Sequence, residues 1–314
     1  MIGTIFTCDH KTFQLPALLA WNLLHTGSVP CDSFSVSFLF QPDMTPALES
    51  AAGFLAMQNG KVVFKGIVDE FSIDLDAGGL TASVNGRGYA ARLLDNESKP
   101  VIYQDATLSE IVRQHVTPYG IPTGEIADLR ASSVYTVAAG SSQWKALDNF
   151  CRTYGGFSPR FAVDGALLAV PEKAGDSFVI TDDTPVTACS LREDRYGVLS
   201  EALVIDKTRN ASYSVKNQDL IDHGGVCRRV LYTPGRSTWA AMRFTGEYQI
   251  QRSKEDQRCV SVTLPGSFVA FPGDRVTLRL SRLGISGEFR VCEAENSFSN
   301  QNGAEVELTL KPLA

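Results

Sequence analysis

The side chains that could do chemistry are few in this chain and scattered along it. Cys8 and His10 lie two residues apart, which on a strand would place both on one face, but a metal ion there would need further ligands. No pair of histidines has the spacing of a helix-borne metal site. His115 lies beside the apolar stripe of an expected helix, where a packed or partly exposed histidine is the common case. The histidines are His10, His25, His115 and His223.

Nucleophile and phosphate-binding signatures are missing as well. The chain has no G-x-S-x-G elbow and no P-loop, and Gly86-Arg-Gly88 gives only G-x-G at the exit of an expected strand, where a tight turn is the simpler interpretation. The seven cysteines are scattered and odd in number, and none forms a C-x-x-C pair. This spacing excludes a zinc ribbon and disfavours a disulfide framework. We expect free or buried thiols in a reducing compartment.

Carboxylates occur in pairs, as in any acidic protein. A glycosidase needs two carboxylates across a cleft, one of them with a raised pKa, and a sequence cannot show a cleft. Solvated residues of a sheet are the favoured interpretation. The pairs are Asp69 with Glu70, Asp74 with Asp76, and Asp182 with Asp183. We therefore predict a protein that is not an enzyme, with no catalytic, cofactor-binding or metal-ligating residue and no cofactor.

Length and charge limit the class of protein. The chain has 314 residues, enough for two or three domains of roughly 100 to 200 residues each. Its formal net charge of −6 disfavours general nucleic-acid binding, which needs clustered Lys and Arg. The N-terminus has no basic n-region, and the apolar run 16–24 is too short to span a bilayer. We expect no specific nucleic-acid binding, no export and no membrane insertion.

Strict alternation of apolar and polar residues marks the elements that carry these side chains. Side chains on a strand point to opposite faces with period two, so each segment has one apolar and one wet face. This pattern is typical of antiparallel sheets with one buried face. The apolar sets are Phe34, Val36, Phe38 and Phe40; Phe71, Ile73 and Leu75; Leu80, Ala82 and Val84; Val276, Leu278 and Leu280; and Val306, Leu308 and Leu310.

The two ends of the chain share an order of features. Residues 60–88, which we interpret as three short strands joined by glycine turns, and residues 273–310 each contain a strand, a glycine, a long strand, a glycine turn and a last strand. This order suggests the duplication of one β-barrel unit. The alternative is that any two meanders look alike.

The middle of the chain differs. A capping box at 107–110 begins a helix that Gly120 helps to end, and a second helix follows Ser141 or Ser142. A hairpin then turns at Asp164-Gly165. These signals predict a small α/β domain.

We predict a mainly β chain in which two antiparallel β domains flank this α/β domain. The expected boundaries are 1–102, 103–175 and 176–314. An accessory segment is expected near 206–258, where the periodicity leaves open a helix from Thr238 or a pair of strands.

The ordered set of segments resembles the phage baseplate hub family, also called the late control gene D protein family. Residues 60–88 are followed by DATLSEIVRQHVTPYGI, in which Thr107, Leu108, Glu110 and Ile111 match a "T-L-x-E-I" helix that ends in Tyr-Gly-Ile. The blocks 141–172, 195–206 and 272–280 also look like the family. The resemblance covers most of the chain and is weakest across 206–258.

The resemblance implies a structural role. Members of this family have two related tail-tube-like β-barrel domains and form trimers, so that a pseudo-sixfold ring joins the sixfold tail tube to the threefold central spike. Expected partners are two further copies of the chain, the spike protein, a tail tube protein or tube initiator, and other baseplate proteins. The expected location is the bacterial host cytoplasm during assembly, and then the baseplate of a virion, a tailocin or another contractile injection system. A β-rich hydrolase of cell-wall glycan or peptide at a tail tip is the alternative.

Overall fold

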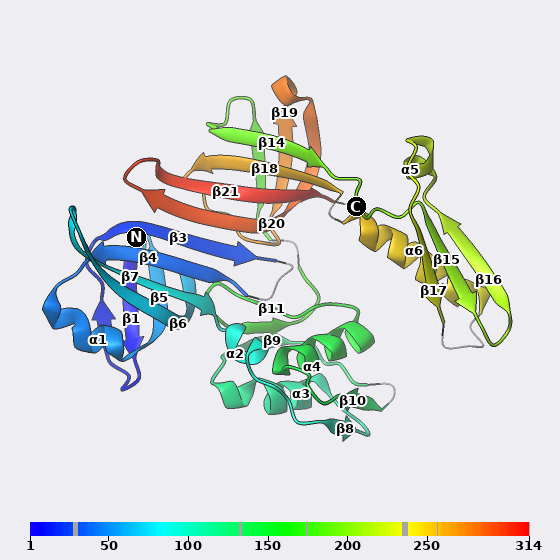
Figure 1. Ribbon diagram of the computed structural model, residues 1–314, viewed down its shortest axis with the longest axis horizontal. Coiled ribbons are helices and arrows are strands. Elements are labelled where there is room, and N and C mark those ends of the chain that lie inside the picture. Colours follow the sequence, from blue (N-terminus) through cyan, green and yellow to red (C-terminus); the bar gives the residue numbers. More distant parts are fainter. Residues whose placement is uncertain (28–30, 132–133, 174, 234–237, 256, 314) are drawn as a thin grey trace.

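The computed structural model describes residues 1–27, 31–131, 134–173, 175–233, 238–255 and 257–313. Strands dominate it, and its largest sheets are antiparallel (Figure 1). This confirms the predicted mainly β class, with two antiparallel β domains and a small α/β domain between them along the chain. The exact boundaries at 102 and 175 stay predictions.

The first β domain buries one face of each of its strands around a single core. In β4 the alternation is as predicted, because Phe34, Val36 and Phe38 are buried while Ser35 is exposed. The elements are β1 (Ile2–Thr7), β2 (Thr12–Gln14), β3 (Leu18–Thr26), β4 (Ser33–Leu39), a 3-10 turn (Pro42–Met44), α1 (Thr45–Glu49), β5 (Ala51–Gln58), β6 (Lys61–Asp76), β7 (Gly79–Gly88) and α2 (Ala91–Leu94).

The second β domain has a core of the same kind. Val276, Leu278 and Leu280 face it from one strand, and Val306, Leu308 and Leu310 face it from another, as the alternation predicts. The elements are β13 (Ser177–Thr181), β14 (Ala188–Glu193), β18 (Arg258–Pro265), β19 (Arg275–Leu280), a 3-10 turn (Ser281–Leu283), β20 (Ile285–Ser299) and β21 (Gly303–Pro312).

The two β domains have the same topology. The order across the sheet is β3-β4-β7-β6-β5-β1 in the first and β14-β18-β21-β20-β19-β13 in the second. With the short strand β2, which pairs only with β1 among the described strands, left out, both orders are 2-3-6-5-4-1 when the strands are numbered along the chain within each domain. One difference is that β1 pairs antiparallel with β5 whereas β13 pairs parallel with β19. The shared order supports the duplication hypothesis more strongly than the sequences do.

Residues 60–88 form two strands and not the three that we predicted. Gly66 does not interrupt β6, which continues to Asp76 and pairs with β7 along most of its length. The glycine instead allows a close approach, because a Cβ at Gly66 would lie 2.1 Å from the Arg87 carbonyl oxygen. Glycines inside strands commonly mark such bends in barrels.

The middle domain follows its sequence signals closely. Thr107 caps the first helix by accepting a hydrogen bond from the Glu110 backbone N–H, and Ser142 caps the second by accepting one from Lys145 N–H. Gly120 and Gly156 take the left-handed conformation after the two helical segments. The elements are β8 (Val101–Tyr103), α3 (Leu108–His115), a 3-10 turn (Thr117–Tyr119), β9 (Thr123–Ile126), β10 (Tyr135–Val137), α4 (Gln143–Phe150), a π turn (Cys151–Gly155), β11 (Arg160–Phe161) and β12 (Leu167–Ala169).

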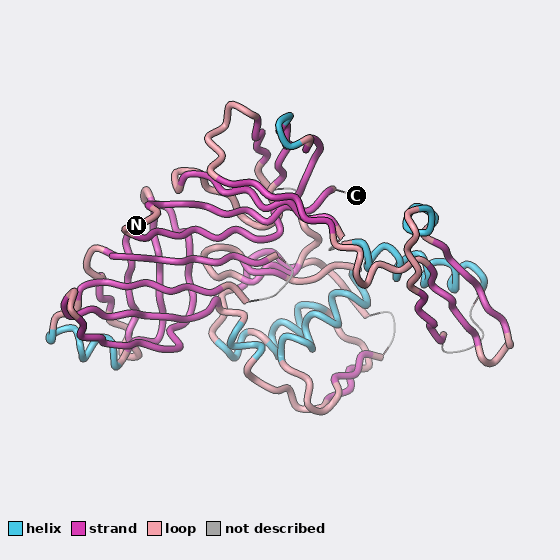
Figure 2. Tube along the Cα trace, turned by 45° about the horizontal axis from the view of Figure 1, so that its top comes forward, coloured by secondary structure: helices cyan, strands magenta, loops and turns pink. Residues whose placement is uncertain are grey.

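A fourth unit, residues 195–256, is inserted between β14 and β18 and extends away from the rest of the molecule (Figures 1 and 2). Its three-stranded sheet packs on one long helix, so the segment from 239 is a helix and not a pair of strands. We call it the accessory unit. It contains β15 (Glu201–Asp206), β16 (Ala211–Lys216), α5 (Gln218–Asp222), β17 (Arg228–Tyr232) and α6 (Trp239–Lys254).

Candidate assembly interface

A single continuous sheet joins the two β domains. Its path runs β14-β18-β21-β20-β3-β4-β7-β6, and the junction is the antiparallel pair β3–β20. The register places Trp21 opposite Phe298 and Leu23 opposite Asn296. The Trp21 ring stacks on Phe298 with centroids 4.5 Å apart, and Trp21 Nε1 donates a hydrogen bond to Asn296 Oδ1 over 2.9 Å. Side-chain contacts therefore fix the register of this junction.

The junction uses a flank of β20 that its own domain leaves open. The first half of β20, residues 285–290, pairs with β19. Beyond a bulge between Val291 and Glu293, residues 293–298 pair with β21 on one side and with β3 on the other. The second half of the long strand thus accepts an edge strand from the neighbouring domain.

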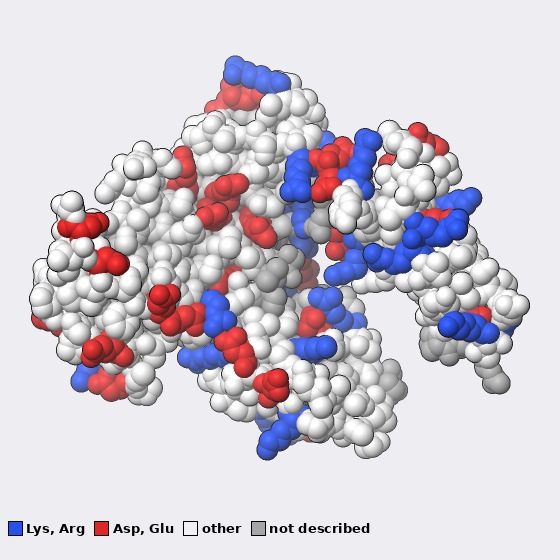
Figure 3. All heavy atoms as spheres, in the orientation of Figure 1, with Lys and Arg blue, Asp and Glu red and all other residues white. Residues whose placement is uncertain are grey.

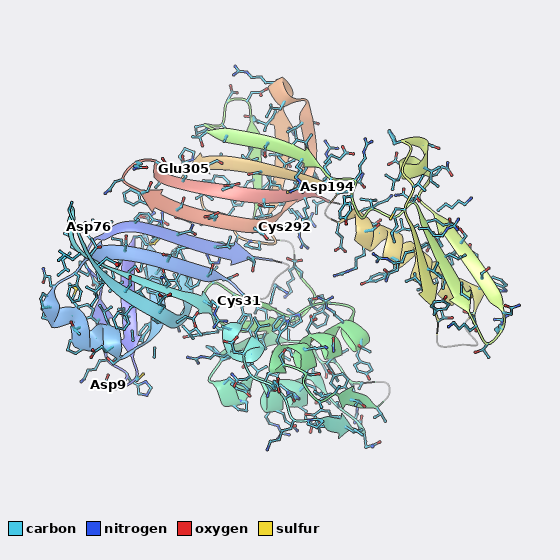
Figure 4. The ribbon with its side chains drawn as sticks, in the orientation of Figure 1. Asp9, Cys31, Asp76, Asp194, Cys292 and Glu305 are labelled. Atoms are coloured by element: carbon cyan, nitrogen blue, oxygen red, sulfur yellow. The ribbon has the colours of Figure 1, made fainter. Side chains whose placement is uncertain are left out.

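The first β domain has the same open flank. Strand β6 pairs with β5 as far as Ile67, and beyond a bulge between Val68 and Glu70 its only partner among the described strands is β7. We call residues 68–76 the distal half of β6. Figure 4 shows Asp76 at the free end of this hairpin. Phe71 packs against the core, but Ile73 is 39% and Leu75 is 79% exposed. The prediction that this face is buried is therefore wrong for Ile73 and Leu75 within the single chain.

Strand β14 forms a second open edge. It pairs only with β18 among the described strands. Leu191 lies opposite Val260, which is fully buried, yet Leu191 is itself 43% exposed. In β3, the equivalent edge strand of the first domain, Leu23 is only 1% exposed because β20 covers its flank. Both open edges therefore present apolar side chains that a neighbouring strand would bury.

The polar face of the continuous sheet is rich in hydroxyl and carboxylate groups. Figure 3 shows acidic side chains scattered over the region of these strands and a concentration of basic ones beside α6. The polar face includes Ser72, Asp74, Ser83, Glu293, Glu295, Ser297, Glu305 and Glu307. Of the carboxylates that the sequence interpretation assigns to a solvated sheet, Asp74 belongs to this wide polar face.

The histidines and cysteines do not form a reactive group in the part of the chain that the structure describes. No set of three or more metal-ligating side chains occurs there. Cys8 and His10 lie in the turn between β1 and β2 and not on a strand, and Cys8 is exposed. Their spacing therefore does not place them on one strand face.

A cleft of about 90 Å³ between the first β domain and the middle domain contains a His–Asp pair. His25 Nδ1 lies 3.3 Å from Asp32 Oδ2, and Asp32 Oδ1 accepts a hydrogen bond from the Thr26 backbone N–H over 2.8 Å. Asp32 thus ties the two sides of the β3–β4 connection together. Burial raises the pKa of the neighbouring Cys31 thiol to about 11, which keeps it protonated and poorly nucleophilic near neutral pH.

A groove of about 500 Å³ between the accessory unit and α4's C-terminal turn has a basic and aromatic lining. Sequence reasoning missed it because its residues come from separate segments of the chain. The lining includes Arg152, Tyr196, Arg229, Tyr248 and Arg252. Arg152 is engaged by Asp148 at 2.8 Å, and Arg229 Nη1 donates to Gln249 Oε1 over 3.3 Å.

Comparison with known proteins gives similarity of fold at low sequence identity. No protein-family model matches the chain, and no match was found among curated proteins. A tail protein from Neisseria meningitidis MC58 matches with a TM-score of 0.78 and 16% identity over 99% of this chain and 96% of that one. The 43 kDa tail protein of prophage MuSo2 from Shewanella oneidensis matches with a TM-score of 0.80 and 16% identity over 99% and 97%.

A third similar structure comes from a secretion system. It is an E. coli protein described as a component of the type VI secretion system that is structurally similar to two tail proteins of bacteriophage T4. It matches with a TM-score of 0.56 and 11% identity over 95% of this chain and 74% of that one. The chain therefore has the fold seen in phage tail proteins and in a secretion-system component. No helix among the described residues is long and apolar enough to cross a membrane.

Proposed function

We propose that this protein is a structural hub subunit in the tail of a phage or of a related contractile injection system. Three copies form a ring with pseudo-sixfold symmetry that joins a sixfold tail tube to a threefold central spike. The location is the bacterial cytoplasm during assembly and then the baseplate of the finished particle. The hub role, the trimer and membership of the late control gene D protein family are parts of this proposal.

The observation that carries the proposal is the repeated topology within one chain. Two β domains with the same strand order stand side by side in one sheet, related by the β3–β20 junction. Three copies of a chain with two like units present six like units, which suits a contact between threefold and sixfold partners. The tail-protein folds of the similar structures support this role.

The proposal assigns no catalytic activity to the chain. A hydrolase of cell-wall material needs paired acids or a metal in a cleft. In the described cleft, Asp32 is held by backbone and histidine contacts, Asp148 forms an ion pair with Arg152, and the nearby Cys31 thiol is held protonated. These groups suit a structural role in the β3–β4 connection better than acid–base catalysis.

Electron microscopy of the purified protein, alone and mixed with a candidate spike protein, tests the proposal. We expect rings with a central lumen and threefold or pseudo-sixfold symmetry, and a particle mass by light scattering of three chains. Compact monomers in both samples would overturn it. The carboxylates of the cleft would then need to be assayed against cell-wall substrates.

A further inference from the structure

We propose that β14 of one copy pairs antiparallel with the distal half of β6 of the next copy, in the register that β3 and β20 use within the chain. This inference rests on the proposed ring and names the two edges that close it. The repeated topology makes the β3–β20 junction a template for the contact between chains, and the equivalent positions can be assigned residue by residue.

The long strands are aligned by their bulges. Each bulge interrupts the ladder at the same place, between Val68 and Glu70 in β6 and between Val291 and Glu293 in β20. Glu70 is therefore equivalent to Glu293. Counting forward along both strands, Leu75 is equivalent to Phe298, the residue that stacks on Trp21.

The edge strands are aligned through the strands beside them. In the first domain, Trp21 pairs with Val36, which pairs with Val84. In the second, Cys189 pairs with Val262, which pairs with Leu308. The registers of the β6–β7 and β20–β21 hairpins make Val84 and Leu308 equivalent. Cys189 is therefore the residue of β14 that is equivalent to Trp21 of β3.

When the register of β3 and β20 is applied to β14 and β6, apolar side chains lie opposite each other. Cys189 of one copy lies opposite Leu75 of the next, and Leu191 lies opposite Ile73. All four side chains project from the sheet face that carries the buried residues of their own domains. Leu75, Ile73 and Leu191 are 79%, 39% and 43% exposed in the single chain. A pairing that covers them removes this apolar surface from water.

Charges on the other face agree with the same register. Arg192 would lie opposite Ser72, with Glu70 and Asp74 as its diagonal neighbours, and such neighbours are within reach of long side chains in antiparallel pairs. In the single chain the Arg192 side chain is largely exposed, and within the described residues its ion pair is with Asp194. A one-residue slip would reverse both the apolar and the charged matches.

A second copy is the occupant because one chain cannot bring its own edges together. Strand β14 begins the sheet path, and β6 follows six intervening strands. Figure 1 shows β14 near the upper edge of the sheet, with β6 and β7 far from it below β4. A head-to-tail contact of this kind uses two different surfaces, and it generates a ring when the rotation between successive copies closes.

A native cysteine makes the register testable. In the Leu75→Cys variant of the full chain, mixed with its candidate spike, mild oxidation should link residue 75 of one copy to Cys189 of the next, since directly opposed residues have Cα atoms about 4.5 to 5.5 Å apart. Nonreducing gels should show covalent dimers and trimers that a reductant removes. The Asp74→Cys control projects from the opposite face, and should give roughly tenfold less product.

Three further variants test the register and the formation of the ring separately. Cys189→Ser in the Leu75→Cys background should abolish the link. Leu191→Asp should leave a folded monomer that no longer assembles, whereas Leu283→Asp, at an exposed site in the turn after β19, should assemble normally. Rings that form without the 75–189 link, or equal links in both cysteine variants, would overturn the register while leaving the hub function standing. Monomers under every condition would overturn both.

Discussion

His115 shows how a residue with catalytic potential is used to hold a core together. The side chain is 4% exposed, its Nδ1 lies 2.6 Å from Gln143 Oε1, and its Nε2 lies 2.9 Å from the Tyr103 hydroxyl. Gln143 Nε2 donates to the Glu97 carbonyl and to the Tyr119 hydroxyl, which fixes its Oε1 toward the ring. His115 Nδ1–H therefore donates to Gln143, while the Tyr103 hydroxyl beside Nε2 donates to Gln114 Oε1 over 2.7 Å. The sequence left open a packed or a partly exposed histidine here, and spacing alone could not identify its partners.

This burial makes the middle domain sensitive to acid. Burial lowers the pKa of His115, with the Gln143 hydrogen bond acting in the opposite direction. The unfolded chain binds the proton more readily, so the free energy of unfolding should fall as pH drops through the ordinary histidine pKa of about 6.5. Above that pH the contribution is fully present.

The His115→Gln variant should lose this part of the pH dependence. At pH 7.5 we expect it to be less stable by about 1 to 2 kcal/mol, because the network loses a partner. Denaturant unfolding at pH 7.5 and 5.5 measures both effects. His223→Gln, at a largely exposed histidine, is the control. An equal loss of stability on acidification in the wild type and in His115→Gln would contradict the assignment.

At the scale of elements, alternation predicted the strands well but could not say what covers them. The apolar faces of β4, β7, β19 and β21 are buried inside their own domains. The same pattern in the distal half of β6 is exposed. The alternation of apolar and polar residues predicts that one face contacts an apolar environment, and that environment can be another copy of the chain. The cap signals at Thr107 and Ser142 succeeded because they act over one helical turn.

The close approach of β6 and β7 depends on glycine. A Cβ at Gly86 would lie 2.0 Å from the Ile67 carbonyl oxygen and 2.6 Å from Phe34 Cε1. Because backbone cannot yield as a flexible side chain can, Gly86→Ala should destabilise the first β domain by roughly 2 kcal/mol or more. Thermal unfolding checks this. Gly78→Ala is the matched control, since its nearest neighbour is the Asp76 carboxylate at 3.1 Å on a flexible side chain. Similar melting temperatures for both variants would contradict the steric argument.

At the scale of the whole molecule, the chain is a duplicated β unit with two additions. The middle domain lies between the two β domains along the chain. The accessory unit is inserted between β14 and β18, the second and third strands of the second β domain. The sequence indicated the duplication through its glycine turns and long strands. It could not show the shared strand order, which depends on pairings between residues far apart, such as Trp21 with Phe298.

The position of the accessory unit makes it removable. Glu193 and Arg258 are register partners at the ends of β14 and β18, and Asp194 N–H donates to the Gln257 carbonyl over 2.7 Å. The chain therefore leaves and re-enters the sheet at adjacent points. The unit also has its own small core, which includes Leu199, Ala202 and Ile250. A two-residue Asn-Gly turn suits the geometry at which two antiparallel strands meet.

Replacement of residues 195–256 by Asn-Gly should leave both β domains folded and able to assemble. Light scattering should report the same number of chains per particle as for the full protein, and the β domains should unfold at nearly the same temperature. A deeper excision of residues 191–260 is the control, because it removes Leu191 from the proposed contact and Val260 from the buried core, and should prevent assembly. Loss of assembly in the shorter excision would mean that the accessory unit, with its arginine-lined groove, takes part in closing the ring.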